Sequence, residues 1–151
     1  MMKEERVTLN IIKWLQETNW VIICYDFPQS GTGIILHPSN GKINEKNKGG
    51  IIPDIIAVKD NQAVFFENKD KFVLSDFEKI YLLKTTSIYI NSLYKLVGDR
   101  KLAYGIGIPK LSESIDKALN HKEKVDFIVT TDDTGAVYIN YDLHQVFSRS
   151  I

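Results

Sequence analysis

Apolar residues recur at helical spacing near the start of the chain and then give way to short, nearly continuous apolar runs. The first pattern predicts a helix over residues 3–18, because one face of it carries the apolar positions Val7, Ile11, Trp14 and Leu15. The next apolar run, residues 20–27, ends at Pro28 and predicts a strand.

A long polar connection separates this strand from the next apolar run. Residues 28–50 are rich in Gly, Ser, Asn and Pro, and a connection of this length in a compact domain often carries function. Within it, Ile34–Leu36 is a candidate for a short extra strand.

Two apolar runs around a polar turn predict a β-hairpin over residues 53–69. The runs are Ile55–Val58 and Ala63–Phe66, and the turn is Lys59–Gln62. Pro53 suits the start of a strand, where its missing N–H does least harm. Because both faces of these strands are apolar, the hairpin is expected to lie near the middle of a sheet, covered on both sides.

The rest of the chain alternates helical and strand patterns. Residues 74–97 predict one long helix, or two helices broken near Thr85–Ser87, with Ser75 as a plausible N-cap and Gly98 as a stop. Further elements are predicted over 102–108 (strand), 112–122 (helix), 125–131 (strand) and 136–141 (strand), and we allow for a short C-terminal helix. This order predicts an α/β fold in which a mixed central β-sheet is flanked by helices on both faces.

Length and composition fit one globular domain, residues 1–151, with 44% hydrophobic and 25% charged residues. No apolar run approaches the roughly 18 residues of a membrane span, and no signal peptide is recognisable, so a cytoplasmic location is expected. Cys24 is the single cysteine, which excludes an intrachain disulfide and, with three scattered histidines, disfavours a zinc site. The net charge is zero, which argues against a basic nucleic-acid coat but leaves room for local basic patches.

The hairpin carries the most informative chemistry of the chain. If Asp60-Asn61 is a two-residue loop, Lys59 pairs with Gln62, and counting back places Asp54 opposite Glu67. Directly opposed residues have Cβ atoms roughly 4.5–5.5 Å apart, where like charges repel. A fold that keeps two carboxylates there is expected to place a cation between them.

Two close carboxylates on rigid strands suit Mg²⁺, which binds oxygen ligands and keeps several waters. Asp54 and Glu67 are the candidate ligands, and the backbone carbonyl of Asn68 is a third. A metal-bound water has a lowered pKa, while Lys69, on the face of Glu67, is suited to position or deprotonate that water or to stabilise phosphoryl charge. These parts predict metal-assisted hydrolysis of a phosphodiester; the alternative is a solvated surface group of charges.

The spacing of Pro53-Asp54, twelve residues, and Glu67-Asn68-Lys69 resembles the motif of the PD-(D/E)XK nucleases, the restriction-endonuclease-like superfamily. The resemblance covers residues 4–109 and implies an αβββαβ core with C-terminal additions. It implies that Asp54 and Glu67 bind Mg²⁺, with Mn²⁺ as a substitute, and that Lys69 assists catalysis. Some members add a first-helix Glu as a metal ligand. Glu4 is the better candidate because it lies on the apolar stripe of the predicted helix, one turn before Val7, and Glu5 is the second candidate. The alternative for either residue is a solvated acid at the helix start, where it suits the helix dipole.

Within this superfamily, the size and the long C-terminal elements favour a type II restriction endonuclease acting as a homodimer on DNA. The alternatives are a Holliday junction resolvase of the same fold, which acts on branched DNA, and an inactive DNA-binding or regulatory protein that keeps the nuclease fold. DNA contacts are expected from basic and amide side chains on both sides of the motif, namely Lys42, Asn47, Lys48, Lys71 and Lys79.

Overall fold

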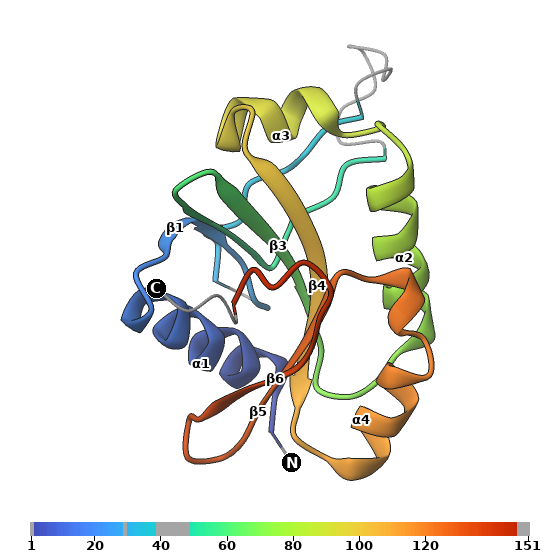
Figure 1. The fold of residues 1–151 in the computed structure, drawn as a ribbon. Helices are drawn as coiled ribbons and strands as arrows, with labels where there is room; N and C mark the ends of the chain where they lie inside the picture. Colours follow the sequence, from blue (N-terminus) through green and yellow to red (C-terminus); the bar gives the residue numbers. More distant parts are fainter. Residues whose placement is uncertain (1, 29, 39–48, 148–151) are drawn as a thin grey trace.

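The computed structural model describes residues 2–28, 30–38 and 49–147 as one β-sheet between helices (Figure 1). Its elements follow the predicted order closely. They are α1 (Glu4–Glu17), β1 (Val21–Tyr25), β2 (Ile55–Lys59), β3 (Gln62–Asn68), α2 (Leu74–Thr85), α3 (Ile90–Val97), β4 (Lys101–Pro109), α4 (Ser112–Leu119), the 3-10 turn η1 (Lys122–Lys124), β5 (Phe127–Thr131) and β6 (Val137–Asp142).

The six strands form a mixed sheet in the order β1-β2-β3-β4-β5-β6. β3, β4 and β5 run parallel to one another, and the remaining neighbours are antiparallel. The two parallel connections pass through helices, α2 and α3 in the first and α4 in the second, as parallel strands require. The predicted mixed sheet is confirmed, with the hairpin strands at its second and third positions.

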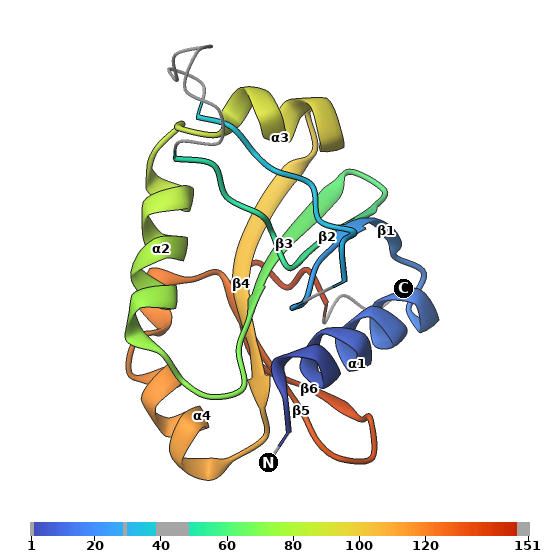
Figure 2. The same ribbon diagram turned by 180° about the vertical axis from the view of Figure 1, so that it is seen from behind.

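Helices cover the two faces of the sheet, as the views from opposite sides show (Figures 1 and 2). On one face, α1 buries Val7, Ile11 and Leu15 against Phe66 of β3. On the other face, Phe65 of β3 packs in a cluster with residues of α2, α3 and α4. Neighbouring residues of β3 serve opposite faces because strand side chains alternate.

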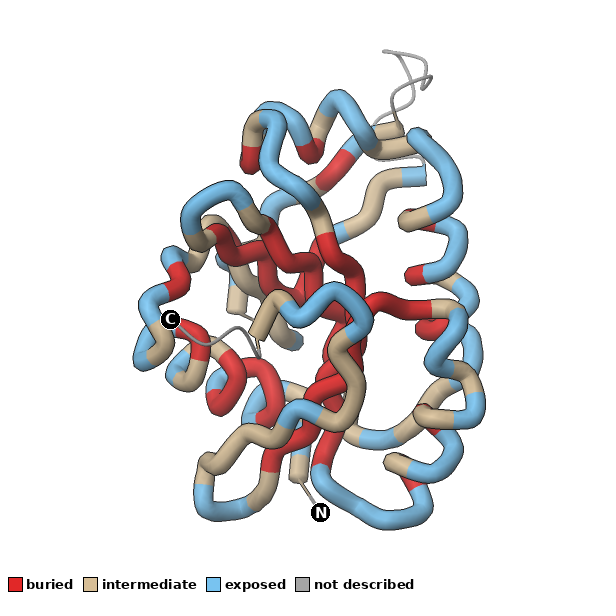
Figure 3. The backbone as a smooth tube through the Cα atoms, in the orientation of Figure 1, coloured by how far each residue is buried: buried red, intermediate tan, exposed pale blue. Residues whose placement is uncertain are grey.

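The hairpin strands form the centre of the buried region (Figure 3). Every apolar side chain from Ile55 to Val58 and from Ala63 to Phe66 is buried. Fully burying one large apolar side chain stabilises a fold by about 1.5–3 kcal/mol, so these residues hold the open end of the hairpin in a rigid setting. Cys24 is buried in β1.

The break within residues 74–97 follows the two-helix alternative. α2 ends at Thr85, and Thr86 is extended with φ −123° and ψ 159°. Gly98 stops α3 as predicted: its φ is 65°, and its N–H donates to the Tyr94 carbonyl at 2.8 Å.

Three local predictions are wrong. Ser75 is not an N-cap, because α2 already begins at Leu74 and the cap position is Val73, which offers no side-chain hydrogen bond. Ile34–Leu36 is no strand; its only ladder contact among the described residues is an isolated bridge between Leu36 and Ile51. Residues 143–147 form turns in place of a helix, since the Asp142 carboxylate accepts the N–H groups of Val146 and Phe147.

No helix in the described part of the chain is long and apolar enough to cross a bilayer.

Candidate active site

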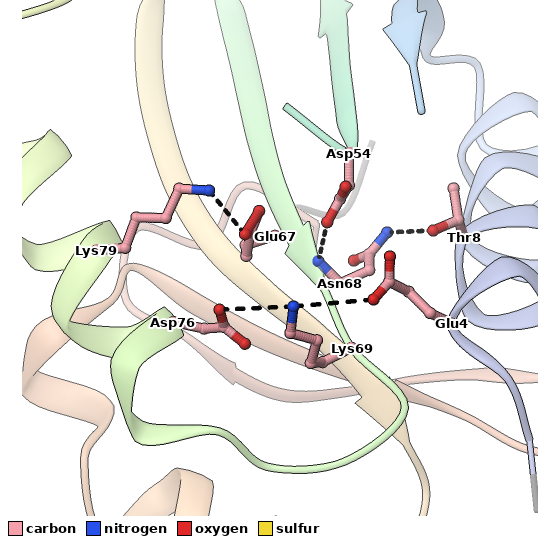
Figure 4. A network of polar contacts seen from close by, with 8 residues as sticks. All are labelled: Glu4, Thr8, Asp54, Glu67, Asn68, Lys69, Asp76 and Lys79. Atoms are coloured by element: carbon pink, nitrogen blue, oxygen red, sulfur yellow. Dashed lines mark hydrogen bonds and ion pairs between the residues drawn. The ribbon is translucent and has the colours of Figure 1, made fainter. Parts of the chain in front are cut away.

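Asp54 and Glu67 lie at the open end of the β2–β3 hairpin (Figure 4). The ladder runs from Lys59 opposite Gln62 to Ile55 opposite Phe66, so the turn count from the sequence is confirmed. One step further, the Asp54 N–H donates to the Phe66 carbonyl at 3.2 Å. The ladder itself ends at Ile55 and Phe66, and the carboxylates of Asp54 and Glu67 interact directly beyond it.

Asn68 connects the acidic pair to α1. Its backbone N–H donates to Asp54 Oδ2 at 2.7 Å, and its side-chain Nδ2 donates to Thr8 Oγ1 of α1 at 3.1 Å. The side chain thus points away from the face of Glu67, as alternation predicts. Because the N–H and C=O of one strand residue point to the same side, the Asn68 carbonyl is directed toward the Asp54 side of β3.

Burial makes the acidic pair electrostatically costly. Asp54 is 9% exposed and Glu67 is 7% exposed. Burial, and next to it repulsion by Glu67, raises the pKa of Asp54 to about 8, although the Asn68 N–H acts in the opposite direction. Glu67 Oε2 is buried without a hydrogen-bond partner. A pair of carboxylates in this state is stabilised by any cation that binds between them.

Lys69 lies between two further carboxylates, one from each neighbouring helix. Its Nζ is 3.9 Å from Glu4 Oε1 of α1 and 4.0 Å from Asp76 Oδ1 of α2. Burial lowers the pKa of Lys69, but the acidic groups around it, Asp76 first among them, outweigh burial and leave that pKa raised. Lys69 is therefore a cation at neutral pH, suited to stabilise negative charge and poorly suited to take up a proton.

Glu4 reaches the site, as its place on the apolar stripe of the first helix predicted. Its carboxylate contacts Lys69, and burial raises its pKa against the opposing effect of Lys69. Glu4 also acts on Asp54 electrostatically, so its carboxylate lies within range of the acidic pair.

Two residues of α2 complete the site, and only one of them was singled out from the sequence. Lys79 Nζ is 2.8 Å from Glu67 Oε1, and Asp76 is 8% exposed with its Oδ2 buried and unpartnered. Asp76 was missed, although the sequence holds a signal for it. It stands at positions i, i+4 and i+7 with Ile80 and Leu83, on the buried stripe of α2.

Of the other predicted DNA contacts, only Lys71 lies in the described part of the chain. Lys71 is exposed on the segment between β3 and α2, while Lys42, Asn47 and Lys48 lie outside the described residues. A second buried ion pair, Lys84 with Asp126 at 2.8 Å, joins α2 to the segment before β5.

The donors at the hairpin fit a hard divalent cation. The atoms are carboxylate oxygens and a carbonyl, which is the set that Mg²⁺ prefers, and Glu67 Oε2 has no partner of its own. In the described residues, no group of three or more His, Cys, Asp or Glu side chains is arranged to hold a metal by itself. Mg²⁺ does not need such a group, since it binds through one or two carboxylates plus substrate phosphates.

A hollow of the described surface lies elsewhere. It measures about 560 Å³ and is lined by residues that include Trp14, Trp20, Lys59, Gln62, Lys101 and Phe147. The hairpin turn contributes to it, so it sits at the far end of β2 and β3 from Asp54 and Glu67. Asp54 and Glu67 therefore lie at the opposite end of these two strands from the hollow.

Comparison with protein-family models, with curated proteins and with solved structures gave no match. The chemistry of the site is therefore inferred from its own side chains.

Proposed function

We propose that the protein is a Mg²⁺-dependent DNA endonuclease that hydrolyses phosphodiester bonds with a PD-(D/E)XK-type site. The observation that carries this proposal is the buried juxtaposition of Asp54 and Glu67 with Lys69 beside them. Two buried carboxylates that repel each other are costly to a fold, and a divalent ion bound between them removes that cost.

Asp54 and Glu67 would hold the metal, with the Asn68 carbonyl as a third oxygen and Glu4 as a further carboxylate nearby. When bound, Mg²⁺ supplies Lewis-acid stabilisation of the phosphoryl group and a water of lowered pKa. Mn²⁺ prefers similar ligands and is expected to substitute.

Lys69 would stabilise negative charge as it develops on a phosphoryl oxygen. Its two acidic neighbours, Glu4 and Asp76, support this role because they favour the ammonium form. They disfavour the alternative in which Lys69 deprotonates the attacking water.

Within this class, we infer a homodimeric type II restriction enzyme. The strands β5 and β6 extend the sheet beyond the αβββαβ order by two strands, and the chain has no net positive charge. Both features favour an enzyme with additions to a minimal core over a small basic resolvase of four-way junctions.

The test is cleavage of plasmid, phage and four-way-junction DNA in the presence of Mg²⁺, with Asp54→Ala as the inactive variant. The matched control is Asp116→Ala, since Asp116 is an exposed acid on α4 without an ion pair among the described residues. Discrete fragments of linear duplex are expected for a restriction enzyme, and symmetric nicking of junctions alone for a resolvase. Absence of cleavage by the wild type, or equal cleavage by Asp54→Ala, overturns the proposal; DNA binding without cleavage points to the inactive-binder alternative.

A further inference from the structure

α2 presents an acid and a base on one face toward the proposed catalytic groups. Asp76 and Lys79 are three residues apart, so their side chains lie one above the other on the helix surface. Phe77 and Ile80 of the same helix are fully buried, which fixes the position and rotation of α2 relative to the sheet.

Each of these two residues contacts the catalytic residue of opposite charge. Lys79 Nζ is 2.8 Å from Glu67 Oε1, and Asp76 Oδ1 is 4.0 Å from Lys69 Nζ. Figure 4 shows Glu67 and Lys69 of the strand edge facing the two α2 side chains. In the chain, Glu67 precedes Lys69 and Asp76 precedes Lys79, so each pair joins the first residue of one segment to the second residue of the other.

The two contacts leave specific atoms available. Lys79 engages Glu67 through Oε1 alone, while Oε2 is buried without a partner. Asp76 and Glu4 approach the Lys69 ammonium from different helices, α2 and α1. At 3.9 and 4.0 Å these contacts are ion pairs without a hydrogen bond, and they attract the ammonium from two sides.

We propose that Asp76 and Lys79 are positioning residues, through which α2 fixes the orientation of Lys69 and of Glu67 for phosphodiester cleavage. The inference rests on the proposed function and deepens it. Partners of metal-binding carboxylates commonly act in this way, and removing one costs about 10- to 100-fold in affinity or activity.

For Lys79 this role differs from a contact with DNA. A lysine that binds a phosphate adds to substrate affinity, so its loss raises KM. A lysine that orients Glu67 acts after the substrate has bound, so its loss lowers kcat.

The test compares Lys79→Met, Lys79→Gln, Lys79→Arg and Asp76→Asn with the wild type. The control is Lys117→Met, which removes a lysine from an exposed helix ion pair with Glu113 at 3.0 Å, away from the site. Lys79→Met, Lys79→Gln and Asp76→Asn should each lower kcat by about 10- to 100-fold with KM for DNA unchanged, whereas Lys79→Arg should retain most activity. Lys117→Met should match the wild type.

A second readout needs neither metal nor DNA. In ¹³C-labelled, metal-free protein, the side-chain carboxyl resonance of Glu67, assigned by its loss in Glu67→Gln, should shift in Lys79→Met and Lys79→Gln but not in Lys117→Met.

Unchanged kcat in folded Lys79 and Asp76 variants of an active enzyme overturns the positioning role alone. So does a raised KM with unchanged kcat, which would assign Lys79 to DNA binding. A wild-type protein that cleaves no DNA overturns the proposed function and the positioning role with it, whatever the resonance of Glu67 shows.

Discussion

The backbone N–H of Asn68 donates to Asp54 Oδ2 across the open end of the hairpin, over 2.7 Å. Among the causes of the Asp54 pKa shift, this bond is the one that lowers the pKa. A single N–H offsets little of the burial and of the repulsion by Glu67, so the pKa of Asp54 remains raised, at about 8. The raised pKa of Asp54 predicts how the stability of the metal-free protein depends on pH.

The stability of the metal-free protein should fall as the pH rises from about 4 to about 8. Below the ordinary pKa of 3.8, Asp54 is protonated in the folded and unfolded states alike, and the shift has no effect. Between the two pKa values the unfolded state releases the proton first, so increasing pH favours unfolding. Urea unfolding across this range measures the loss.

Asp54→Asn should flatten this pH dependence and exceed the wild type in stability at pH 8, because the amide stays neutral. Asp116→Asn serves as the control, since an exposed acid has little effect on the slope. A wild type whose stability is level or rises between pH 4 and pH 8 would contradict the burial of a repelling pair.

Mg²⁺ should stabilise the folded protein at pH 8 in the absence of DNA. A ligand that binds only the folded state at 100 times its Kd adds about 2.7 kcal/mol. Thermal unfolding with increasing Mg²⁺ or Mn²⁺ measures this gain, which should disappear in Glu67→Gln and persist in Asp116→Ala. An equal gain in wild type and Glu67→Gln would place the ion elsewhere on the surface.

Gly105→Ala should destabilise the protein through overpacking. A Cβ at Gly105 of β4 would overlap the ring of Phe127 on β5, and such overpacking costs about 1–3 kcal/mol. Phe127→Leu in the Gly105→Ala background should recover part of that loss, measured by urea unfolding. Strictly additive effects of the two substitutions would show that the glycine is not required by the ring.

Lys84→Met should destabilise the protein far more than Lys117→Met. The Lys84–Asp126 pair is 20% and 6% exposed, whereas the Lys117–Glu113 pair is 55% and 82% exposed. Removing one partner of a buried pair costs roughly 3–5 kcal/mol, reduced here because Lys84 keeps some contact with water. An exposed i,i+4 pair contributes about 0.3–0.5 kcal/mol. Similar unfolding midpoints for the two variants would contradict this ranking.

The sequence predicts the site only as far as local spacing reaches. A two-residue turn fixes the register of an antiparallel hairpin, so the positions of Asp54, Glu67 and Lys69 followed from counting residues. The contacts of Glu67 with Lys79 and of Lys69 with Asp76 depend on how α2 packs against the sheet. Hydrophobic periodicity does not specify that packing.

The errors at element ends have a similar origin. Ser75 has the side chain of an N-cap, yet the backbone becomes helical one residue earlier, at Leu74. After β6, the carboxylate of Asp142 binds the N–H groups of Val146 and Phe147, and this local competition favours turns over the short helix that we allowed for.

The parallel course of β3, β4 and β5 has a consequence for how this protein can change. All three strands leave the sheet at the edge where Glu67 lies, so the segments after them, residues 69–73, 110–111 and 132–136, emerge on that side. Insertions into such segments disturb the buried core little. For the proposed nuclease, loops that read DNA could therefore be inserted beside an unaltered candidate site, so that target choice could change independently of bond cleavage.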